Sequence, residues 1–242
     1  PVLPHGIMKI VLTLAGLLGA THFALAAPTA SRPNVLFILA DDLGWRDLSC
    51  YGSPFCETPN LDRLAREGLR FTQAYTAGAV CSPTRASLMT GKYPVRTGVT
   101  DYIPGLASTG RKLSTQRTKT ELALEEDTIG EAFRSGGYET FYAGKWHLGG
   151  QGFEPPEQGF EHYVGDAQLG NHGRDWQVGK RLAEAAVKFI GARDAQRPFF
   201  AYLSFHEPHL PILEYPDHIQ RFRDKAARLP SLAEASQAEH DG

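Results

Sequence analysis

Two adjacent carboxylates, Asp41 and Asp42, directly follow a short apolar run at residues 35–40. Like charges at the end of a buried strand repel each other unless a cation neutralises them. A hard ion such as Ca²⁺ or Mg²⁺ suits carboxylate oxygens better than zinc does. The pair is therefore a candidate metal site, although an Asp-Asp pair taken alone is more commonly a turn or a helix cap.

A cysteine, Cys81, stands two residues before Pro83 and four before Arg85. Because proline suits the first turn of a helix, we expect Cys81 just before a helix whose free N–H groups and positive dipole end face an anion. Arg85, one turn along, adds a fixed positive charge. A thiol in this place would be unusually reactive. A buried cysteine beside a helix cap is the alternative explanation of a bare C-x-P-x-R pattern.

Polar side chains also follow two further predicted strands, at residues 140–143 and 198–203. Binding sites in parallel sheets form at the carboxyl ends of the strands, so we expect these side chains to lie near the Asp pair. Any one of the histidines among them could instead be an ordinary loop histidine with a satisfied hydrogen bond. The side chains are Lys145, His147, His206 and His209.

Strand and helix patterns alternate along the chain, which predicts an α/β domain with a mostly parallel sheet. A helix is expected after Thr58, with Pro59 at its first position, and another after Thr128, which forms a capping box with Glu131. Apolar residues at helical spacing predict a third helix at 181–192. The polar stretch at 108–120 is expected to be an exposed loop.

The composition is that of an ordinary globular chain, with 242 residues, 42% of them hydrophobic, and a net charge of −2. Basic residues are scattered among acidic ones and form no stripe that could follow a phosphate backbone. We therefore expect no nucleic-acid partner, and an anionic substrate would have to be bound by a local cluster of charges.

The first 26 residues predict a leader segment rather than part of the fold. Lys9 precedes an apolar run at 10–20, and Ala-Leu-Ala at 24–26 is the small-x-small pattern that a signal peptidase cleaves. The run is shorter than the roughly 20 apolar residues that span a bilayer. We expect residues 1–26 to comprise a few upstream residues and a cleaved signal peptide, with no stable membrane anchor and a periplasmic or secreted mature protein.

Three cysteines cannot all pair within one molecule in an oxidising compartment. Cys50 and Cys56 flank a Gly-Ser-Pro turn and could form a disulfide, or could be two small half-buried hydrophobic residues. In either case Cys81 is left without a partner.

The segment 79–91, AVCSPTRASLMTG, resembles the first signature of the type I sulfatases at every position. The segment 137–147, GYETFYAGKWH, resembles the second signature equally well. The order and spacing of the Asp pair, the helix after Thr58 and the strand at 198–203 also look like this family. The resemblance covers nearly all of residues 33–215, and it implies an alkaline phosphatase-like α/β fold, a mostly parallel sheet flanked by helices, here truncated.

The resemblance implies a nucleophile made from Cys81. A formylglycine-generating enzyme would oxidise this cysteine to formylglycine, whose hydrate attacks the sulfur of a sulfated small molecule or glycan. Asp41, Asp42 and the modified residue 81 would hold Ca²⁺ or Mg²⁺. The hydrate could later expel sulfate by collapsing to the aldehyde, which an ordinary thiol cannot do.

The resemblance also assigns roles to the other polar residues. Arg85 and Lys145 would stabilise charge in the transition state, and His147 would be the base for the aldehyde-forming step. One of His206 and His209 would contact the sulfate, and we favour His209 because it lies in a Pro-His-x-Pro sequence.

Several parts of the family pattern do not occur in this sequence: the remaining metal ligands, a second active-site lysine and the smaller C-terminal domain. We therefore expect residues 27–242 to be the N-terminal part of a sulfatase catalytic domain and to be inactive when isolated. The alternatives are a phosphonate or phosphate monoester hydrolase of the same superfamily, or a non-catalytic homologue. The presence of Cys81, Arg85 and Lys145 argues against the last of these.

Overall fold

The computed structural model describes residues 32–105 and 117–229, so the predicted signal peptide and most of the predicted loop at 108–120 lie outside it. The described residues form a four-stranded sheet in the order β1-β4-β2-β3, and every neighbouring pair is parallel. This arrangement confirms the predicted fold class. The strands are β1 (Val35–Asp41), β2 (Glu139–Gly144), β3 (His162–Val164) and β4 (Phe199–Pro208).

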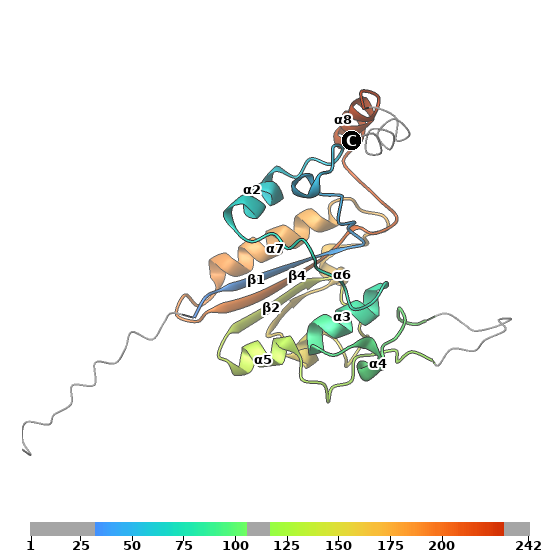
Figure 1. The fold of residues 1–242 in the computed structure, drawn as a ribbon. Coiled ribbons are helices and arrows are strands. Elements are labelled where there is room, and N and C mark those ends of the chain that lie inside the picture. The colour runs from blue at the N-terminus through green and yellow to red at the C-terminus, as the bar shows by residue number, and fades with distance from the viewer. Residues whose placement is uncertain (1–31, 106–116, 230–242) are drawn as a thin grey trace, which may run out of the picture. The chain divides into compact units, whose positions relative to one another are not determined.

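Helices cover both faces of the sheet (Figure 1): α7 packs on one face, and α3 and α5 pack on the other. These three are α3 (Cys81–Thr90), α5 (Ile129–Ser135) and α7 (Val178–Ala192). The remaining elements are η1 (Ser49–Tyr51), α2 (Pro59–Glu67), α4 (Pro94–Thr97), η2 (Pro155–Gln158), α6 (Asp166–Leu169) and α8 (Pro216–Ala226). No helix of the described ranges is long and apolar enough to cross a membrane.

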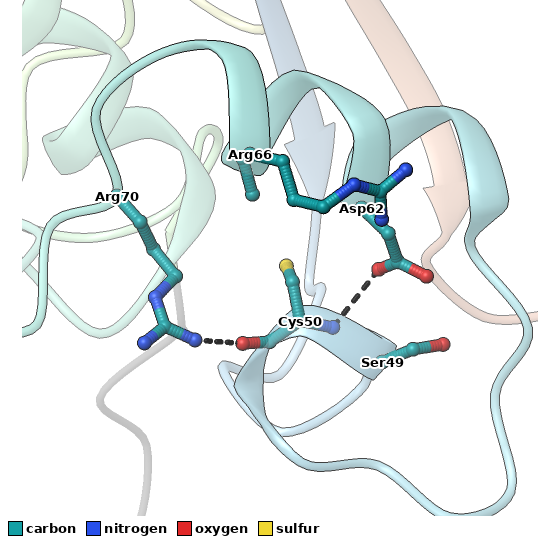
Figure 2. Close-up of a pocket in the computed structure, with 6 residues that line it drawn as sticks. Ser49, Cys50, Asp62, Arg66 and Arg70 are labelled. Carbon is teal, nitrogen blue, oxygen red and sulfur yellow. Dashed lines mark hydrogen bonds between the residues drawn. The ribbon is translucent and has the colours of Figure 1, made fainter.

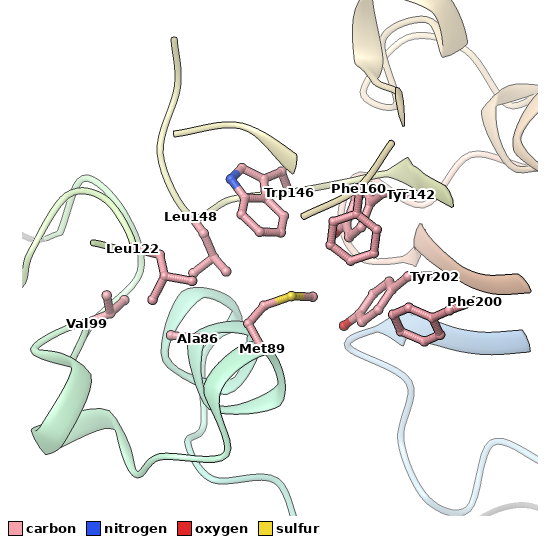
Figure 3. Packing of buried hydrophobic residues seen from close by; sticks show 10 residues of the cluster. All are labelled: Ala86, Met89, Val99, Leu122, Tyr142, Trp146, Leu148, Phe160, Phe200 and Tyr202. Carbon is pink, nitrogen blue, oxygen red and sulfur yellow. The ribbon is translucent and has the colours of Figure 1, made fainter. Parts of the chain in front are cut away.

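Alternate residues of the two central strands supply the two cores, because successive side chains of a strand point to opposite faces. Tyr142 and Tyr202 stack with their ring centroids 5.0 Å apart and face α3, whose Met89 packs against them (Figure 3). Their neighbours Ala143 and Leu203 point to the other face, where α7 covers them. The sheet is thus fixed from both sides at the strands that carry the polar clusters.

The helix signals in the sequence are confirmed. In α5, the backbone N–H of Glu131 donates to Thr128 Oγ1 at 3.1 Å, and the N–H of Thr128 donates to Glu131 Oε2 at 2.9 Å, which is the expected capping box. Helix α2 begins at Pro59 and ends before Gly68, as expected. Thr58 does not cap it with its side chain, however, because its hydroxyl donates to the carboxylate of Asp62.

Strand β1 is parallel, as expected, but it is not buried on both faces. Its Leu36 and Ile38 side chains are 48% and 55% exposed, whereas Phe37 and Leu39 pack against a core. The prediction of a fully buried strand was therefore wrong for the described part of the chain. A continuous apolar run indicates a strand covered on both faces, and β1 lies at the edge of this four-stranded sheet.

One strand end and one whole strand also differ from the prediction. Strand β4 continues to Pro208, so His206 lies within it rather than after it. The three-residue strand β3 carries too short a pattern to be distinguished in the sequence and was not predicted.

Cys50 and Cys56 are both free, so the disulfide alternative is wrong in this structure. Figure 2 shows Cys50 in η1, with its thiol pointing toward α2. Its backbone N–H donates to Asp62 Oδ1 at 2.9 Å, and Arg70 donates to its carbonyl oxygen. Cys50 therefore helps to join η1 to α2.

Candidate active site

The carboxyl ends of β1, β2 and β4 bring the predicted charges together. Asp41, the last residue of β1, is 6% exposed. Its Oδ1 lies 3.2 Å from Nη2 of Arg85, and its Oδ2 forms an ion pair with the Lys145 ammonium. Cys81 Sγ lies 3.9 Å from the same Oδ2 and 3.6 Å from Lys145 Nζ. One carboxylate, two cations and one thiol thus form a single cluster.

Arg85 is held in this cluster by the backbone that follows β2. Its guanidinium, buried almost completely, donates through Nη1 to the Lys145 carbonyl oxygen at 2.8 Å and to Ser204 Oγ at 2.5 Å. The same carbonyl oxygen accepts from Ser204 at 2.7 Å and from the Tyr142 hydroxyl at 2.6 Å. Tyr142 was not predicted as a site residue, because an apolar strand pattern does not distinguish it from a core residue, and Ser204, directly after the predicted strand at 198–203, was not predicted either.

The charges of the cluster set the protonation of its members. Burial alone raises the pKa of the Asp41 carboxyl, but the Lys145 ammonium and the Arg85 guanidinium outweigh burial and hold that pKa below its usual value. Burial raises the pKa of the Cys81 thiol, and the ammonium of Lys145 only partly opposes this. The unmodified cysteine is therefore a poor thiolate nucleophile at neutral pH.

Cys81 is the first residue of α3, not the residue before it, since Val80 occupies the N-cap position. No acidic residue lies in the first turn of this ten-residue helix. The positive end of the helix dipole thus adds to the charges of Arg85 and Lys145. Together they make the surroundings of residue 81 attractive to an anion.

The backbone of His147 is in an unusual conformation, and a hydrogen bond holds its imidazole in place. It adopts a left-handed φ of 58°, which is uncommon for a residue other than glycine. Its Nε2 lies 2.6 Å from the carbonyl oxygen of Ile103, which can only accept, so Nε2 carries the proton and Nδ1 the lone pair. Burial lowers the pKa of His147. The residue can therefore act as a base through Nδ1.

His209 lies on the other side of the carboxylates. One ligand atom each of Asp41, Cys81 and His209 lie within 4.8 Å of one another, a spacing that could hold a metal ion. His209 Nδ1 donates to the Leu210 carbonyl oxygen at 2.6 Å, which leaves Nε2 for contacts at the site. That Nε2 lies 3.6 Å from Oδ2 of Asp42, which has a φ of 62°.

His206 occupies a different environment from His209. It is 8% exposed, its ring stacks on His172 at a centroid distance of 4.8 Å, and its Nε2 lies 3.7 Å from Asp166 Oδ1. Burial, followed by the neighbouring His172, lowers its pKa to about 4. Of the two candidate histidines, the structure groups His209 with Asp41 and Cys81, and it places His206 in the wall of a cavity.

That cavity has a volume of about 640 Å³ and opens beside the cluster. Such a volume is in the range of small-molecule sites. Three of its lining residues, Lys145, Trp146 and His147, belong to the second signature segment, and Lys145 and His147 are the two with ionisable side chains. The others are Gly149, Glu154, Tyr163, Gly165, Asp166, Ala167, Gln168 and His206.

A methyl group at Gly144 should disrupt the site. Gly144 has a φ of +99°, and a Cβ added to it would lie 2.0 Å from the Ser204 carbonyl oxygen. We expect Gly144→Ala to lower the free energy of unfolding by about 3 kcal/mol or more, because strain and overpacking combine. Gly152→Ala is the matched control, since its φ is +85° and no atom lies within 4 Å of the added Cβ. Urea melts of the two variants would test this, and equal losses would contradict it.

His206 should make the stability depend on pH. Its pKa is lowered from 6.5 to about 4 in the folded protein, so below pH 6.5 the unfolded chain binds more protons at this position. The free energy of unfolding should therefore fall as the pH drops from 6.5 through 4, and His206→Gln should make this dependence shallower. His218→Gln, at an exposed histidine of α8, is the control. Thermal melts at several pH values would test this. If the stability of His206→Gln depended on pH as steeply as that of the wild type, the assignment would be refuted.

The family model of the sulfatases matches residues 33–236. The chain belongs to the sulfatase family. Among relatives, it is 46% identical over 147 residues to arylsulfatase A of Homo sapiens, covering 59% of this chain and 27% of that protein. It is 34% identical over 242 residues to N-acetylgalactosamine-6-sulfatase of Canis lupus familiaris, covering 85% of this chain and 44% of that protein. This sulfatase chain thus spans less than half the length of either relative.

Solved structures support the same fold. BT4656, in complex with its substrate D-glucosamine-2-N,6-O-disulfate, is similar with a TM-score of 0.66 at 27% identity, covering 83% of this chain and 39% of that one. The phosphonate monoester hydrolase of Agrobacterium radiobacter is similar with a TM-score of 0.59 at 25% identity, covering 79% of this chain and 44% of that one.

Proposed function

We propose that the protein hydrolyses sulfate esters, with a nucleophile made from Cys81. The observation that carries the proposal is the cluster at the strand ends, in which the Cys81 sulfur lies within 4 Å of both Asp41 and the Lys145 ammonium, beside buried Arg85. Two cations and a helix N-terminus there suit a sulfate group. Membership of the sulfatase family and the two signature segments support this assignment.

Cys81 would have to be modified before it acts. In the proposed reaction, a formylglycine-generating enzyme oxidises it to an aldehyde, which hydrates to a geminal diol. One hydroxyl of the diol loses its proton and attacks sulfur, the bond between sulfur and the ester oxygen breaks, and that oxygen takes up a proton and leaves as the alcohol. The second hydroxyl then loses its proton, and reformation of the aldehyde C=O bond expels sulfate. The raised pKa of the unmodified thiol agrees with a need for an oxygen nucleophile.

The donor atoms at the strand ends fit a divalent cation. Asp41 and Asp42 offer carboxylate oxygens, and after oxidation residue 81 would offer an oxygen in place of sulfur, which suits Ca²⁺ or Mg²⁺. A bound cation would lower the pKa of a hydroxyl beside it and shield the charge of the sulfate. The Asp41 carboxylate would bind this cation while it also contacts Arg85 and Lys145.

The remaining residues of the cluster would act on the sulfate and on protons. Arg85 and Lys145 are fixed by buried contacts, so they can stabilise charge that develops on the sulfate oxygens without reorganising. His147 would accept the diol proton at Nδ1, the atom that its bond to Ile103 leaves free. His209 would contact the sulfate or protonate the leaving oxygen through Nε2.

The proposal includes where the protein acts and on what. The leader pattern at residues 1–26 supports a periplasmic or secreted enzyme. Relatives named arylsulfatase A and N-acetylgalactosamine-6-sulfatase, and the sugar disulfate bound to BT4656, support a sulfated small molecule or glycan as substrate.

A phosphonate monoester hydrolase is the second candidate, because the similar structure from Agrobacterium radiobacter has that activity in its name. The test uses the whole protein, co-expressed with a formylglycine-generating enzyme. Peptide mass spectrometry should show an aldehyde at position 81, and kcat/KM for 4-nitrophenyl sulfate should exceed that for a phenylphosphonate monoester. Unmodified cysteine in every peptide, or a preference for the phosphonate, would reject the proposal.

A further inference from the structure

The cavity beside the cluster differs in charge from the cluster itself. At the cluster it is lined by Lys145, and elsewhere by the carboxylates Glu154 and Asp166. Both carboxylates, after burial, raise the pKa of Tyr163 to about 12, so the Tyr163 hydroxyl stays protonated among them. The cavity therefore offers hydrogen-bond acceptors with negative charge next to a centre that attracts anions.

His206 adds a further polar side chain to the wall of this cavity. Its side chain is 10% exposed, and its Nδ1 has no hydrogen-bond partner among residues 32–105 and 117–229. Nε2 faces Asp166 at 3.7 Å, so Nδ1 is the nitrogen left over. The polar groups of this part of the wall are therefore the His206 imidazole and the Asp166 carboxylate beside its Nε2.

These charges define what part of a substrate can enter. With the sulfate at Cys81 and Lys145, the alcohol portion extends into the cavity, where Glu154 and Asp166 accept hydrogen bonds and repel negative charge. Hydroxyl or ammonium groups satisfy such acceptors. An unsubstituted aromatic ring has no donors for them, and a uronate or a second sulfate meets like charge.

We infer that Asp166 and Glu154 are specificity-determining residues that select a hydroxyl-rich alcohol without further negative charge, namely a singly sulfated neutral sugar or free-amine amino sugar. This inference rests on the proposed sulfatase activity. The two residues would contact the leaving alcohol rather than the sulfate.

The test compares kcat/KM of the whole, matured protein on three kinds of substrate. These are 4-nitrophenyl sulfate, a panel of monosulfated neutral hexoses covering each hydroxyl position, and the uronate or disulfated analogue of the best hexose. The wild type should prefer the neutral hexose sulfate to its anionic analogue by roughly tenfold or more. Asp166→Asn and Glu154→Gln should each reduce this preference, and the double variant should remove most of it.

Glu184→Gln, which changes an exposed carboxylate of α7 paired with Lys180 at 3.8 Å, is the matched control and should leave the preference unchanged. Asp166→Asn and Glu154→Gln test the same inference independently. If Asp166→Asn fails to fold, Glu154→Gln decides. Hydrolysis of 4-nitrophenyl sulfate without a preference for the neutral sugar would overturn the inference, as would a preference that both carboxamide variants retain. Absence of hydrolysis of every sulfate ester would instead reject the proposed function.

Discussion

Cys81→Ala should abolish hydrolysis of 4-nitrophenyl sulfate by the whole, matured protein, with kcat/KM falling by about ten-thousandfold or more. The reason is that no other group in the cluster can attack sulfur and then expel the sulfate. Asp41 is engaged by Arg85 and Lys145, and a carboxylate that attacked sulfur would have no second hydroxyl through which to release it. The effect should appear in kcat/KM without a matching loss of thermal stability.

Two further variants make the assignment of Cys81 specific. Cys81→Ser keeps an oxygen nucleophile but lacks the second hydroxyl of the diol, so it should transfer at most one sulfate per chain and then stop, which intact-mass measurement would show. Cys50→Ala changes a free cysteine in η1, outside the cluster, and should keep wild-type turnover. Continuous turnover by Cys81→Ser, or loss of activity in Cys50→Ala, would contradict the proposed chemistry.

Much of the fold could be predicted because local patterns and tertiary structure agree. The capping box at Thr128 and the proline at the start of α2 each fix a helix end through contacts within a few residues. The strand patterns in β2 and β4 are apolar because helices cover both of their faces. The same reasoning failed for β1, where Leu36 and Ile38 are half-exposed, because the sequence of a strand does not report its place in the sheet.

The charges of the candidate site could be predicted for a similar reason. Asp41 and Lys145 each lie at the end of a parallel strand, and parallel strands bring such residues to one edge. Ser204 could not be found this way, because its hydrogen bond to the Lys145 carbonyl oxygen depends on the register between β2 and β4. Tyr142 could not be found because its sequence position is that of an ordinary core residue of β2. Asp166 was not singled out in the sequence because it lines the cavity only through the way that loops and helix α6 come together.

The two adjacent carboxylates offer a way to separate metal binding from ion pairing. Asp41 is buried and contacts Arg85 and Lys145, whereas the side chain of Asp42 is 56% exposed and faces His209. If both hold the cation, Asp41→Asn and Asp42→Asn should each weaken Ca²⁺ binding by about tenfold or more, because each removes a charged ligand. Both should lose most of the sulfatase activity with it.

In the presence of a chelator the two variants should differ in stability. Asp41→Asn leaves the buried guanidinium of Arg85 without its counter-charge, and removing one partner of a buried ion pair costs about 3–5 kcal/mol of unfolding free energy. Asp42→Asn removes an exposed charge and should change stability by less than about 1 kcal/mol. The stability should also depend on pH. The lowered pKa of Asp41 means that its ionised carboxylate stabilises the fold, and this stabilisation is lost as the pH falls through the lowered pKa. Asp41→Asn should lose this acid sensitivity.

The measurements are calcium titration by calorimetry and urea melts in EDTA at several pH values between about 3 and 7, the range in which carboxylates titrate. Loss of calcium binding in both variants, with loss of stability confined to Asp41→Asn, would establish that Asp41 serves both the metal and the buried cations. Wild-type calcium affinity in both variants would remove the pair from the metal site. Equal stability of Asp41→Asn and the wild type in EDTA would show instead that the ion pair with Arg85 contributes nothing to the fold.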